Sequence, residues 1–306
     1  MDIIDKNIII SELTSNIPGL NVFADEPMKN HTSFKIGGAA DVFVSPETEE
    51  QLVGTVEFLK GKSIEYTVIG NGSNLLVSDK GIRGAVLCVG KNFSHVNCID
   101  DTIYASGGTL LSRIASCALD NELTGFEFAS GIPGSLGGAI VMNAGAYGGE
   151  IKDVVVKTKY IDTDGTIKQC VRTEHEFLYR KSRFGNGEII ISSSLKLKKG
   201  NPSEIRAYMN ELASKRKEKQ PIELPSAGST FKRPEGYFAA KLIDDAGLRG
   251  CRIGDAMVSE KHCGFVVNMG SASCDDVQKL IAHIQDTVYT KFGVELETEV
   301  KMLGEF

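Results

Sequence analysis

The chain has 306 residues, of which 42% are hydrophobic and 24% are charged, a balance that is typical of a globular protein with a full core. Its formal net charge of −6 offers no overall attraction to nucleic acid or to anionic lipid, so we expect neither as a partner. No apolar stretch is long enough to span a bilayer. The stretch MDIIDKNIIISEL predicts a short amphipathic helix and not a leader peptide, because Asp2, Asp5 and Lys6 interrupt its apolar run.

Cysteines and histidines are few and scattered along the chain. The seven cysteines are odd in number and form no C-x-x-C pair, and the five histidines show no metal-ligand spacing. We therefore expect reduced, mostly buried thiols in a cytoplasmic protein, with no disulfide framework and no metal site.

The first segment, to about residue 80, predicts a β-α-β-like unit. We expect a strand at Asp41–Val44, a helix from about Glu47 to Lys60, and a second strand at Glu65–Ile69. The apolar residues that share one face of this helix are Leu52, Val53, Val56 and Leu59.

The second segment, from about 81 to 200, is richer in strands. Its β-branched and apolar runs predict strands at Ala85–Val89, Thr102–Ala105, Val154–Ile161 and Ile189–Ser193. Asp164-Gly165 is a hairpin signal, and a helix is expected at Leu110–Asn121.

The third segment opens with Asn201-Pro202, a suitable N-cap and first residue for a helix that extends to about Lys217. That helix is expected to turn Ile205, Tyr208, Met209 and Leu212 inward. A second helix is expected from about Asp275 to Phe292, ending at Gly293, and a last strand at Val294–Leu303. Its expected inward residues are Val277, Leu280, Ile281, Ile284 and Val288. The mixture predicts an α+β protein with a module at 1–200, itself divided near residue 80, and another at 201–306.

Two glycine-rich stretches could hold a ligand with their backbone. In YTVIGNGSNLL, Gly70 and Gly72 allow positive φ and close approach, so that N–H groups can point at an anion. A dinucleotide-type G-x-G-x-x-G would need glycine where Leu75 stands, so that interpretation fails. Taken alone, this stretch favours a tight turn over a phosphate-binding site.

The second stretch, SGIPGSLGGAIVMNAGAYGG at 130–149, has an apolar middle, unlike a flexible linker. Close packing of backbone elements through small residues would explain it without a ligand. Two such stretches in one chain nevertheless favour a dinucleotide whose pyrophosphate lies between them.

These motifs together resemble a known family. GNGSNLL followed by SGIPGSLGGAIVMNAGAYGGE is similar to the FAD-binding fold of the p-cresol methylhydroxylase and vanillyl-alcohol oxidase type. Within it the chain resembles the UDP-N-acetylenolpyruvoylglucosamine reductases, or UDP-N-acetylmuramate dehydrogenases, of peptidoglycan synthesis. The further motifs that carry the resemblance are NHTSFKIGGAAD, FLYRKSRF, KQPIELPSAGSTFKRP, CGFVVN and ETEVKMLG.

The resemblance implies FAD as a tightly but non-covalently bound cofactor, since neither stretch contains a histidine or cysteine for attachment, and NADPH as co-substrate. The module at 1–200 would bind FAD, and the module at 201–306 the substrate. The residues expected at FAD are Gly70, Asn71, Gly72, Ser73, Asn74, Gly131, Ile132, Pro133, Gly134, Ser135, Gly138, Asn143, Ala144 and Gly145.

The same resemblance assigns three catalytic residues. Ser229 matches the proton donor, Arg180 the arginine that stabilises an enolate-like intermediate, and Glu299 a glutamate near the C-terminus. From the residues alone, a serine such as Ser229 is more often a turn residue than an acid, and Arg180 could be an ordinary surface residue. Alternation in the last strand would leave Glu295, Glu297 and Glu299 all facing solvent.

Tyr179, Lys219 and Arg233 match positions that contact substrate in the family, although some members carry Asn in place of Arg233. A basic run precedes the Ser229 loop and could hold the UDP diphosphate or simply solvate a helix end; it comprises Lys215, Arg216, Lys217 and Lys219. One subgroup of the family carries an extra insertion with a tyrosine, and no such insertion precedes Lys219 here. The chain therefore resembles the subgroup that lacks the insertion.

We therefore expect an enzyme that reduces UDP-N-acetylglucosamine enolpyruvate to UDP-N-acetylmuramate with NADPH, acting as a monomer. Hydride would pass from flavin N5 to C3 of the enolpyruvyl group, and a proton from Ser229 to C2. An FAD-dependent hydroxy-acid or alcohol oxidase on the same fold is one alternative. A flavin- or UDP-sugar-binding protein without turnover is another.

Overall fold

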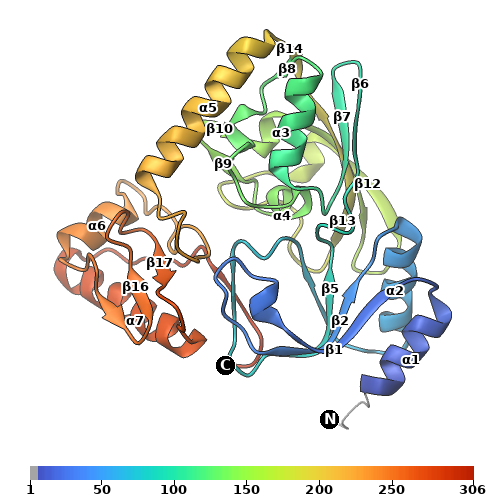
Figure 1. The fold of residues 1–306 in the computed structure, drawn as a ribbon, viewed down its shortest axis with the longest axis horizontal. Coiled ribbons are helices and arrows are strands. Elements are labelled where there is room, and N and C mark those ends of the chain that lie inside the picture. Colours follow the sequence, from blue (N-terminus) through green and yellow to red (C-terminus); the bar gives the residue numbers. More distant parts are fainter. Residues whose placement is uncertain (1–5) are drawn as a thin grey trace. The chain divides into compact units, whose positions relative to one another are not determined.

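The computed structural model describes residues 6–306, and its chain divides into two compact units (Figure 1). The first unit contains the chain up to Ala24, Val42–Asn71 and Gly84–Lys215. The second contains Asp25–Asp41, Gly72–Arg83 and Arg216–Phe306. Neither unit is continuous in sequence, which differs from the contiguous modules expected at 1–200 and 201–306.

The N-terminal part of the first unit packs two helices on a mixed sheet. The helices are α1 (Lys6–Asn16) and α2 (Glu49–Gly61), and the sheet order is β1 (Asn21–Pro27), β2 (Ala39–Ser45), β5 (Ile82–Cys88) and β3 (Tyr66–Ile69). The expected β-α-β elements are confirmed, but β5 separates β2 from β3 and runs parallel to β3. The N-terminal helix is confirmed from Lys6 onward; residues 1–5 lie outside the described part of the chain.

Local signals explain α2. The side chain of Thr48 caps it by accepting a hydrogen bond from Gln51 N, and Glu49 and Glu50 stand in its first turn, where they favour the helix dipole. Its buried residues Leu52, Val56 and Leu59 join a core with Leu13 of α1.

A five-stranded sheet forms the remainder of the first unit. Its order is β12 (Ile167–Val171), β11 (Val155–Ile161), β13 (Ile189–Lys196), β7 (Thr102–Ser106) and β6 (Val96–Ile99), and all pairs are antiparallel. The hairpin at Asp164-Gly165 is confirmed: Gly165 has φ 92° and its N–H donates to Asp162 O. Alternation did not indicate the edge strands β6 and β12. β12 is mostly exposed, and β6 contains no buried residue.

Two helices pack on this sheet. The expected helix is confirmed as α3 (Leu111–Asp120), and a further short helix, α4 (Leu136–Val141), forms inside the glycine-rich stretch. Leu111 and Ile114 of α3 and Leu136 and Ile140 of α4 join one core with the sheet. The shorter elements here are β8 (Leu123–Thr124), η2 (Glu127–Ala129), β9 (Gly145–Ala146), β10 (Gly149–Glu150), η3 (Ile151–Asp153), η4 (Arg172–His175) and β14 (Lys198–Lys199).

The second unit has its own core around helix α7 (Cys274–Phe292). Ser273 caps α7 with a reciprocal Asp276 contact, and Gly293 ends it at φ 66°. The five inward residues expected for this helix are all buried. Around it lie η1 (Met28–Asn30), α6 (Ala239–Asp245), β15 (Arg252–Ile253), β16 (Ala256–Val258) and β17 (Val266–Asn268), with a parallel pair of β4 (Leu75–Val77) and β18 (Lys301–Leu303).

Two local expectations are wrong. In α5 (Pro202–Lys219), Ile205 and Leu212 are buried, but Tyr208 is 41% exposed, because the helix buries only a narrow stripe. The last strand is limited to Lys301–Leu303, since the preceding residues make only an isolated bridge between Thr298 and Phe231. No helix within residues 6–306 has the length and apolar character needed to cross a membrane.

Candidate active site

The first unit brings the two glycine-rich stretches together. Asn71 Nδ2 donates a hydrogen bond to Pro133 O at 2.5 Å, and a Cβ on Gly70 would overlap the hydroxyl of Ser135. The turn after β3 therefore lies against residues 133–135. Two backbone stretches that bind one ligand must be close to each other in this way.

Backbone hydrogen bonds hold the start of α4 against the end of β7. Gly137 N donates to Gly107 O at 2.7 Å and Leu136 N to Thr109 O at 2.9 Å. A Cβ on Gly107 would overlap Ile190 O, so this approach requires glycine. The sequence motifs did not identify Gly107 or the adjacent Gly108 as site residues. Their only sequence signal is a Gly-Gly dipeptide soon after an expected strand.

Gly138 provides a test of whether this stretch fits a flavin nucleotide. It lies within α4, where glycine costs about 1 kcal/mol relative to alanine. Nevertheless, apart from its chain neighbours and the backbone of its own helix, the protein atom within 4 Å of a Cβ placed there is Ser135 Oγ, at 3.8 Å. Packing inside the described protein gives no reason for this glycine, whereas close approach of a bound group does, so the stretch fits FAD.

A tight turn carries Tyr179 and Arg180. Leu178 N donates to Lys181 O at 2.8 Å, and Arg180 has φ 53°, a strained value for a residue with a side chain. Arg180 Nη2 lies 3.4 Å from Gly145 O, and its guanidinium stacks 5.1 Å from the ring centre of the half-exposed Tyr179. The first unit thus brings Arg180 together with a residue expected at the flavin.

The second unit places Ser229 and Glu299 on adjoining segments. Thr230 follows Ser229 and is buried, with its N–H donating to Gly264 O and its carbonyl accepting from Glu299 N, each at 2.8 Å. Its hydroxyl accepts from Val266 N at 3.0 Å. Ser229 itself is exposed and directly precedes this anchored residue.

The residues around these segments clarify two expectations. Glu297 is exposed whereas Glu299 is half-buried, so the structure separates two glutamates that alternation treats alike. Within the same unit, Asn74 Nδ2 donates to Glu299 O at 3.0 Å. A Cβ on Gly72 would overlap His31 O, so contact with the backbone already explains that glycine.

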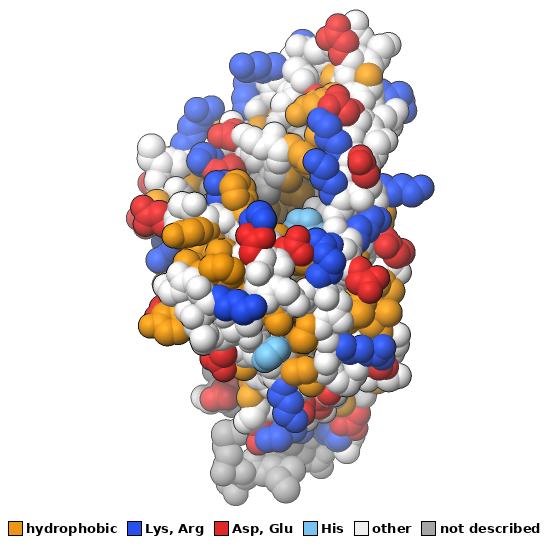
Figure 2. All heavy atoms as spheres, turned by 90° about the vertical axis from the view of Figure 1, so that its left-hand side faces the viewer, with side chains coloured by type: hydrophobic (Ala, Val, Ile, Leu, Met, Phe, Trp, Pro, Cys, Tyr) orange, Lys and Arg blue, Asp and Glu red, His pale blue; other side chains and the backbone are white. Residues whose placement is uncertain are grey.

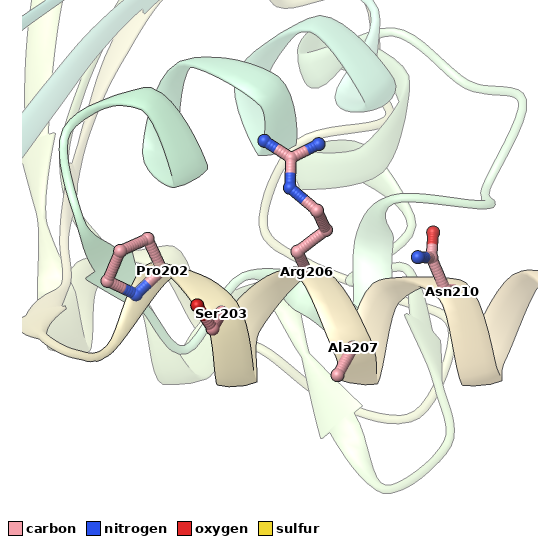
Figure 3. A pocket seen from close by; sticks show the side chains of 5 residues that line it. All are labelled: Pro202, Ser203, Arg206, Ala207 and Asn210. Carbon is pink, nitrogen blue, oxygen red and sulfur yellow. The ribbon is translucent and has the colours of Figure 1, made fainter.

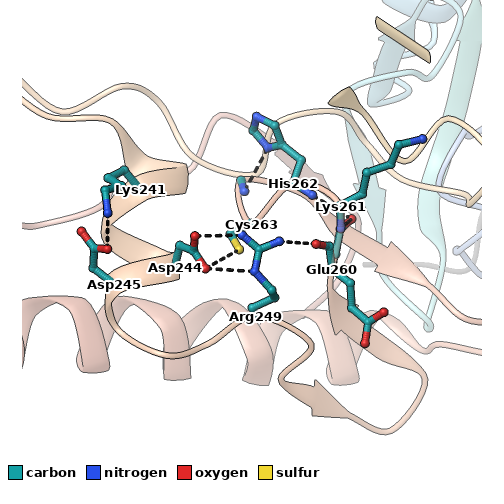
Figure 4. A network of polar contacts seen from close by, with 10 residues as sticks. Lys241, Asp244, Asp245, Arg249, Glu260, Lys261, His262 and Cys263 are labelled. Atoms are coloured by element: carbon teal, nitrogen blue, oxygen red, sulfur yellow. Dashed lines mark hydrogen bonds and ion pairs between the residues drawn. The ribbon is translucent and has the colours of Figure 1, made fainter. Parts of the chain in front are cut away.

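A polar network links Asp244, Arg249, Glu260 and Cys263 (Figure 4). Arg249 makes two bonds to Asp244, at 2.8 and 3.0 Å, and a third to Glu260 O, which fastens the segment that leads to Gly264. Cys263 Sγ lies 3.6 Å from Asp244 Oδ1, and burial raises the pKa of this thiol. These contacts hold the segment whose Gly264 carbonyl receives Thr230 N.

Residues expected at the substrate lie on exposed surface. Lys219 is exposed at the end of α5, and Arg233 stacks 4.0 Å from the ring centre of Phe238. Lys215 pairs with Glu211, which raises the pKa of the lysine. On the face shown in Figure 2, the coloured basic and acidic side chains are mixed, and no large area there carries basic ones alone.

A hollow of about 340 Å³ lies along α5, away from these candidates (Figure 3). All of its lining residues belong to that helix: Pro202, Ser203, Arg206, Ala207 and Asn210. No residue expected at flavin or substrate lines it. In the described chain, no group of His, Cys, Asp and Glu is suited to a metal ion, and all seven cysteines are free thiols.

The fold and these glycine-rich contacts define an FAD-binding protein. The family described as "FAD binding domain" matches residues 40–171. The family described as "UDP-N-acetylenolpyruvoylglucosamine reductase, C-terminal domain" matches residues 220–303.

Relatives extend this likeness over nearly the whole chain. A UDP-N-acetylenolpyruvoylglucosamine reductase from Agathobacter rectalis is 51% identical over 97% of this chain and 98% of its own. One from Clostridioides difficile is 53% identical over 93% and 94%. The crystal structure of the Thermus caldophilus enzyme matches with a TM-score of 0.79 at 35% identity, covering 93% and 98%.

The chain therefore belongs to the UDP-N-acetylenolpyruvoylglucosamine reductase family and is an FAD-dependent oxidoreductase. The family and the α+β, FAD-binding fold expected from the sequence motifs are confirmed.

Proposed function

We propose that this protein reduces UDP-N-acetylglucosamine enolpyruvate to UDP-N-acetylmuramate, a step of peptidoglycan precursor synthesis, and that Arg180, Ser229 and Glu299 carry the chemical step. FAD is the cofactor and NADPH the co-substrate of this family. The observation that carries the proposal is the Glu299 N to Thr230 O hydrogen bond of 2.8 Å, which keeps the Glu299 segment beside that of Ser229.

We assign FAD to residues of the two glycine-rich stretches, with Asn143 contributing only its backbone. They are Gly70, Asn71, Gly72, Ser73, Asn74, Gly131, Ile132, Pro133, Gly134, Ser135, Gly138, Asn143, Ala144 and Gly145. FAD bound there would accept hydride from NADPH and pass it on to the substrate. The glycines give its pyrophosphate access to backbone N–H groups without side-chain interference.

Arg180 has the chemistry needed to stabilise negative charge on the substrate. Hydride addition at C3 of the enolpyruvyl group leaves charge at C2 and on the adjacent carboxylate. A planar guanidinium can bind a carboxylate at two points and remains charged at any working pH. Its placement near Gly145, a residue of the glycine-rich stretch, supports a position close to the reacting group. We propose that Glu299 acts in the same step.

Ser229 would complete the reaction by donating its hydroxyl proton to C2. A serine hydroxyl is a weak acid, so it can serve only against a strongly basic carbanion, which this reaction generates. Its exposure leaves it accessible, and the three backbone-directed contacts of Thr230 hold its position. These properties support the proton-donor role.

Tyr179, Lys219 and Arg233 would bind the substrate, with Lys219 contacting the UDP diphosphate. The pairing of Lys215 with Glu211 favours Lys219 over Lys215 for this role. We further propose the functional modules 1–200 for FAD and 201–306 for substrate. The protein would act as a cytoplasmic monomer without a nucleic-acid partner. The net charge of −6 supports the absence of a nucleic-acid partner, and the free thiols support the cytoplasmic location.

The test is an anaerobic titration of the holoenzyme followed by flavin absorbance. NADPH should bleach the flavin, and the enolpyruvyl UDP-sugar should restore its colour stoichiometrically. Reduction by a hydroxy acid or an alcohol in place of NADPH would instead identify an oxidase. A bound flavin that no enolpyruvyl sugar reoxidises would identify a binding protein without turnover, and light scattering would test the monomer.

A further inference from the structure

Asn143 occupies an unusual position at the end of the glycine-rich stretch. Its side chain is fully buried, and its φ of 42° lies in the left-handed region that asparagine tolerates better than most residues. Its amide oxygen accepts from Lys152 N at 3.0 Å, and its amide nitrogen donates to Glu150 Oε2 and Leu178 O, each at 3.1 Å. The side chain is thus directed into the protein and not toward a ligand.

The hydrogen bond from Asn143 Nδ2 to Leu178 O connects Asn143 to the turn that carries Arg180. Leu178 begins the turn that holds Arg180 at φ 53°, a conformation that persists only where its surroundings enforce it. Ser182, just after the turn, donates to Val141 O at 2.9 Å. Contacts with the end of α4 and the residues after it therefore fasten the turn on both sides.

The electrostatics favour the same arrangement. Hydrogen bonds from Lys152 and Asn143 lower the pKa of Glu150, and the charge of Arg180 acts in the same direction. The ionised Glu150 accepts from the Asn143 amide, which orients that amide so that its nitrogen faces Leu178. An aspartate at position 143 would lose both donors and add a charge beside Glu150.

We propose that Asn143 is a positioning residue for Arg180: it links the flavin-binding stretch to the turn that presents the guanidinium. This proposal rests on the catalytic role proposed for Arg180. It differs from the expectation that the Asn143 side chain binds FAD. A displacement of about 1 Å at a catalytic group can slow a reaction by about 10²-fold, so one buried amide can control the rate without touching substrate.

The test variant is Asn143→Gly, because glycine keeps positive φ accessible and removes only the side chain. Glu122→Gly is the matched control, since Glu122 is an exposed residue of the same unit with φ 57°. We expect N143G to retain its FAD and its reduction by NADPH within about twofold, and to be reoxidised by the enolpyruvyl sugar about 10²-fold more slowly. E122G should leave all three properties unchanged.

A second measurement does not depend on activity. Trypsin cleavage of the holoenzyme after Arg180 and Lys181, resolved by mass spectrometry, reports how often the turn opens. N143G should accelerate this cleavage by about tenfold, and E122G should not. If N143G does not fold, Asn143→Ser replaces it, because serine removes the amide that reaches Leu178 O without adding a charge beside Glu150.

A double-mutant cycle with Arg180→Lys identifies the route of the effect. If Asn143 acts through Arg180, the N143G change should slow reoxidation much less in the R180K background. If N143G loses FAD while its cleavage rate is unchanged, the proposal is overturned in favour of a side chain that binds flavin. If both cleavage and reoxidation of N143G are unchanged, the proposal is also overturned. If R180K alone reoxidises normally, the proposed role of Arg180 fails, while the cleavage rates still decide whether Asn143 holds the turn.

Discussion

Replacing Ser229 with alanine should separate the two halves of the catalytic cycle. The change removes one exposed hydroxyl, and the backbone bonds of Thr230 to Gly264 and Glu299 remain. Exposed substitutions of this kind change the free energy of unfolding by about 0.5 kcal/mol or less. The variant should therefore fold, bind FAD and be reduced by NADPH at nearly the normal rate.

The second half-reaction should carry the whole loss. Removing a positioned general acid slows a reaction by about 10²–10⁴-fold, which corresponds to about 2.7–5.5 kcal/mol of transition-state stabilisation. Ser229→Cys should recover part of the rate, because a thiol can also donate a proton. Ser112→Ala, a change of an equally exposed serine on α3, is the matched control and should reoxidise normally.

Anaerobic stopped-flow absorbance measures both steps on the same sample: NADPH is mixed first, and the enolpyruvyl sugar second. The reasoning is refuted if S229A reoxidises at the normal rate, or if its reduction by NADPH fails while reoxidation is intact. Equal slowing of both steps would indicate a disturbed flavin site and would also contradict the proton-donor role.

The remaining predictions concern substrate affinity, flavin attachment and pH. Lys219→Ala should raise the KM for the UDP-sugar by about tenfold and leave flavin reduction intact. Lys215→Ala is the control and should change that KM little, because Lys215 pairs with Glu211. Equal effects on KM would indicate that the basic run only solvates the helix end. Acid or heat precipitation should release the yellow colour to the supernatant, and colour retained in the pellet would indicate a covalent flavin. Burial lowers the pKa of His175, so the folded protein binds a proton there less readily than the unfolded chain. This contribution to stability is present above about pH 6.5 and is lost as the pH falls below it. His175→Gln should therefore reduce the fall in the free energy of unfolding between pH 7.5 and pH 5.5, as measured by urea denaturation. An unchanged pH dependence would exclude His175 as a cause of that fall.

Much of the architecture was predictable because it depends on local chemistry. Helix α7 combines a 3.6-residue apolar period, a serine cap and a terminal glycine, so each local signal indicates the same element. The hairpin at Asp164-Gly165 follows from the positive φ that Gly165 adopts. The family is evident from motifs whose order along the chain is itself a sequence property.

Long-range pairing was not predictable in the same way. The three-residue strands β4 and β18 pair with each other although they lie far apart in the chain, and segments so short carry no usable periodicity. Helix α4 is rich in glycine, so its propensity argues against it, and it forms because its first residues bond to the end of β7.

For the candidate site, the amino-acid sequence by itself determined which residue types were available: glycines for close approach, Arg180 for charge, and Ser229 for a proton. Only the tertiary structure decided that Glu299 adjoins the Ser229 loop, and that Asn143 turns its amide inward to hold the Arg180 turn. The physical reason is that these contacts join segments far apart in the chain. Their hydrogen bonds form only once the surrounding cores have packed, so no local pattern encodes them.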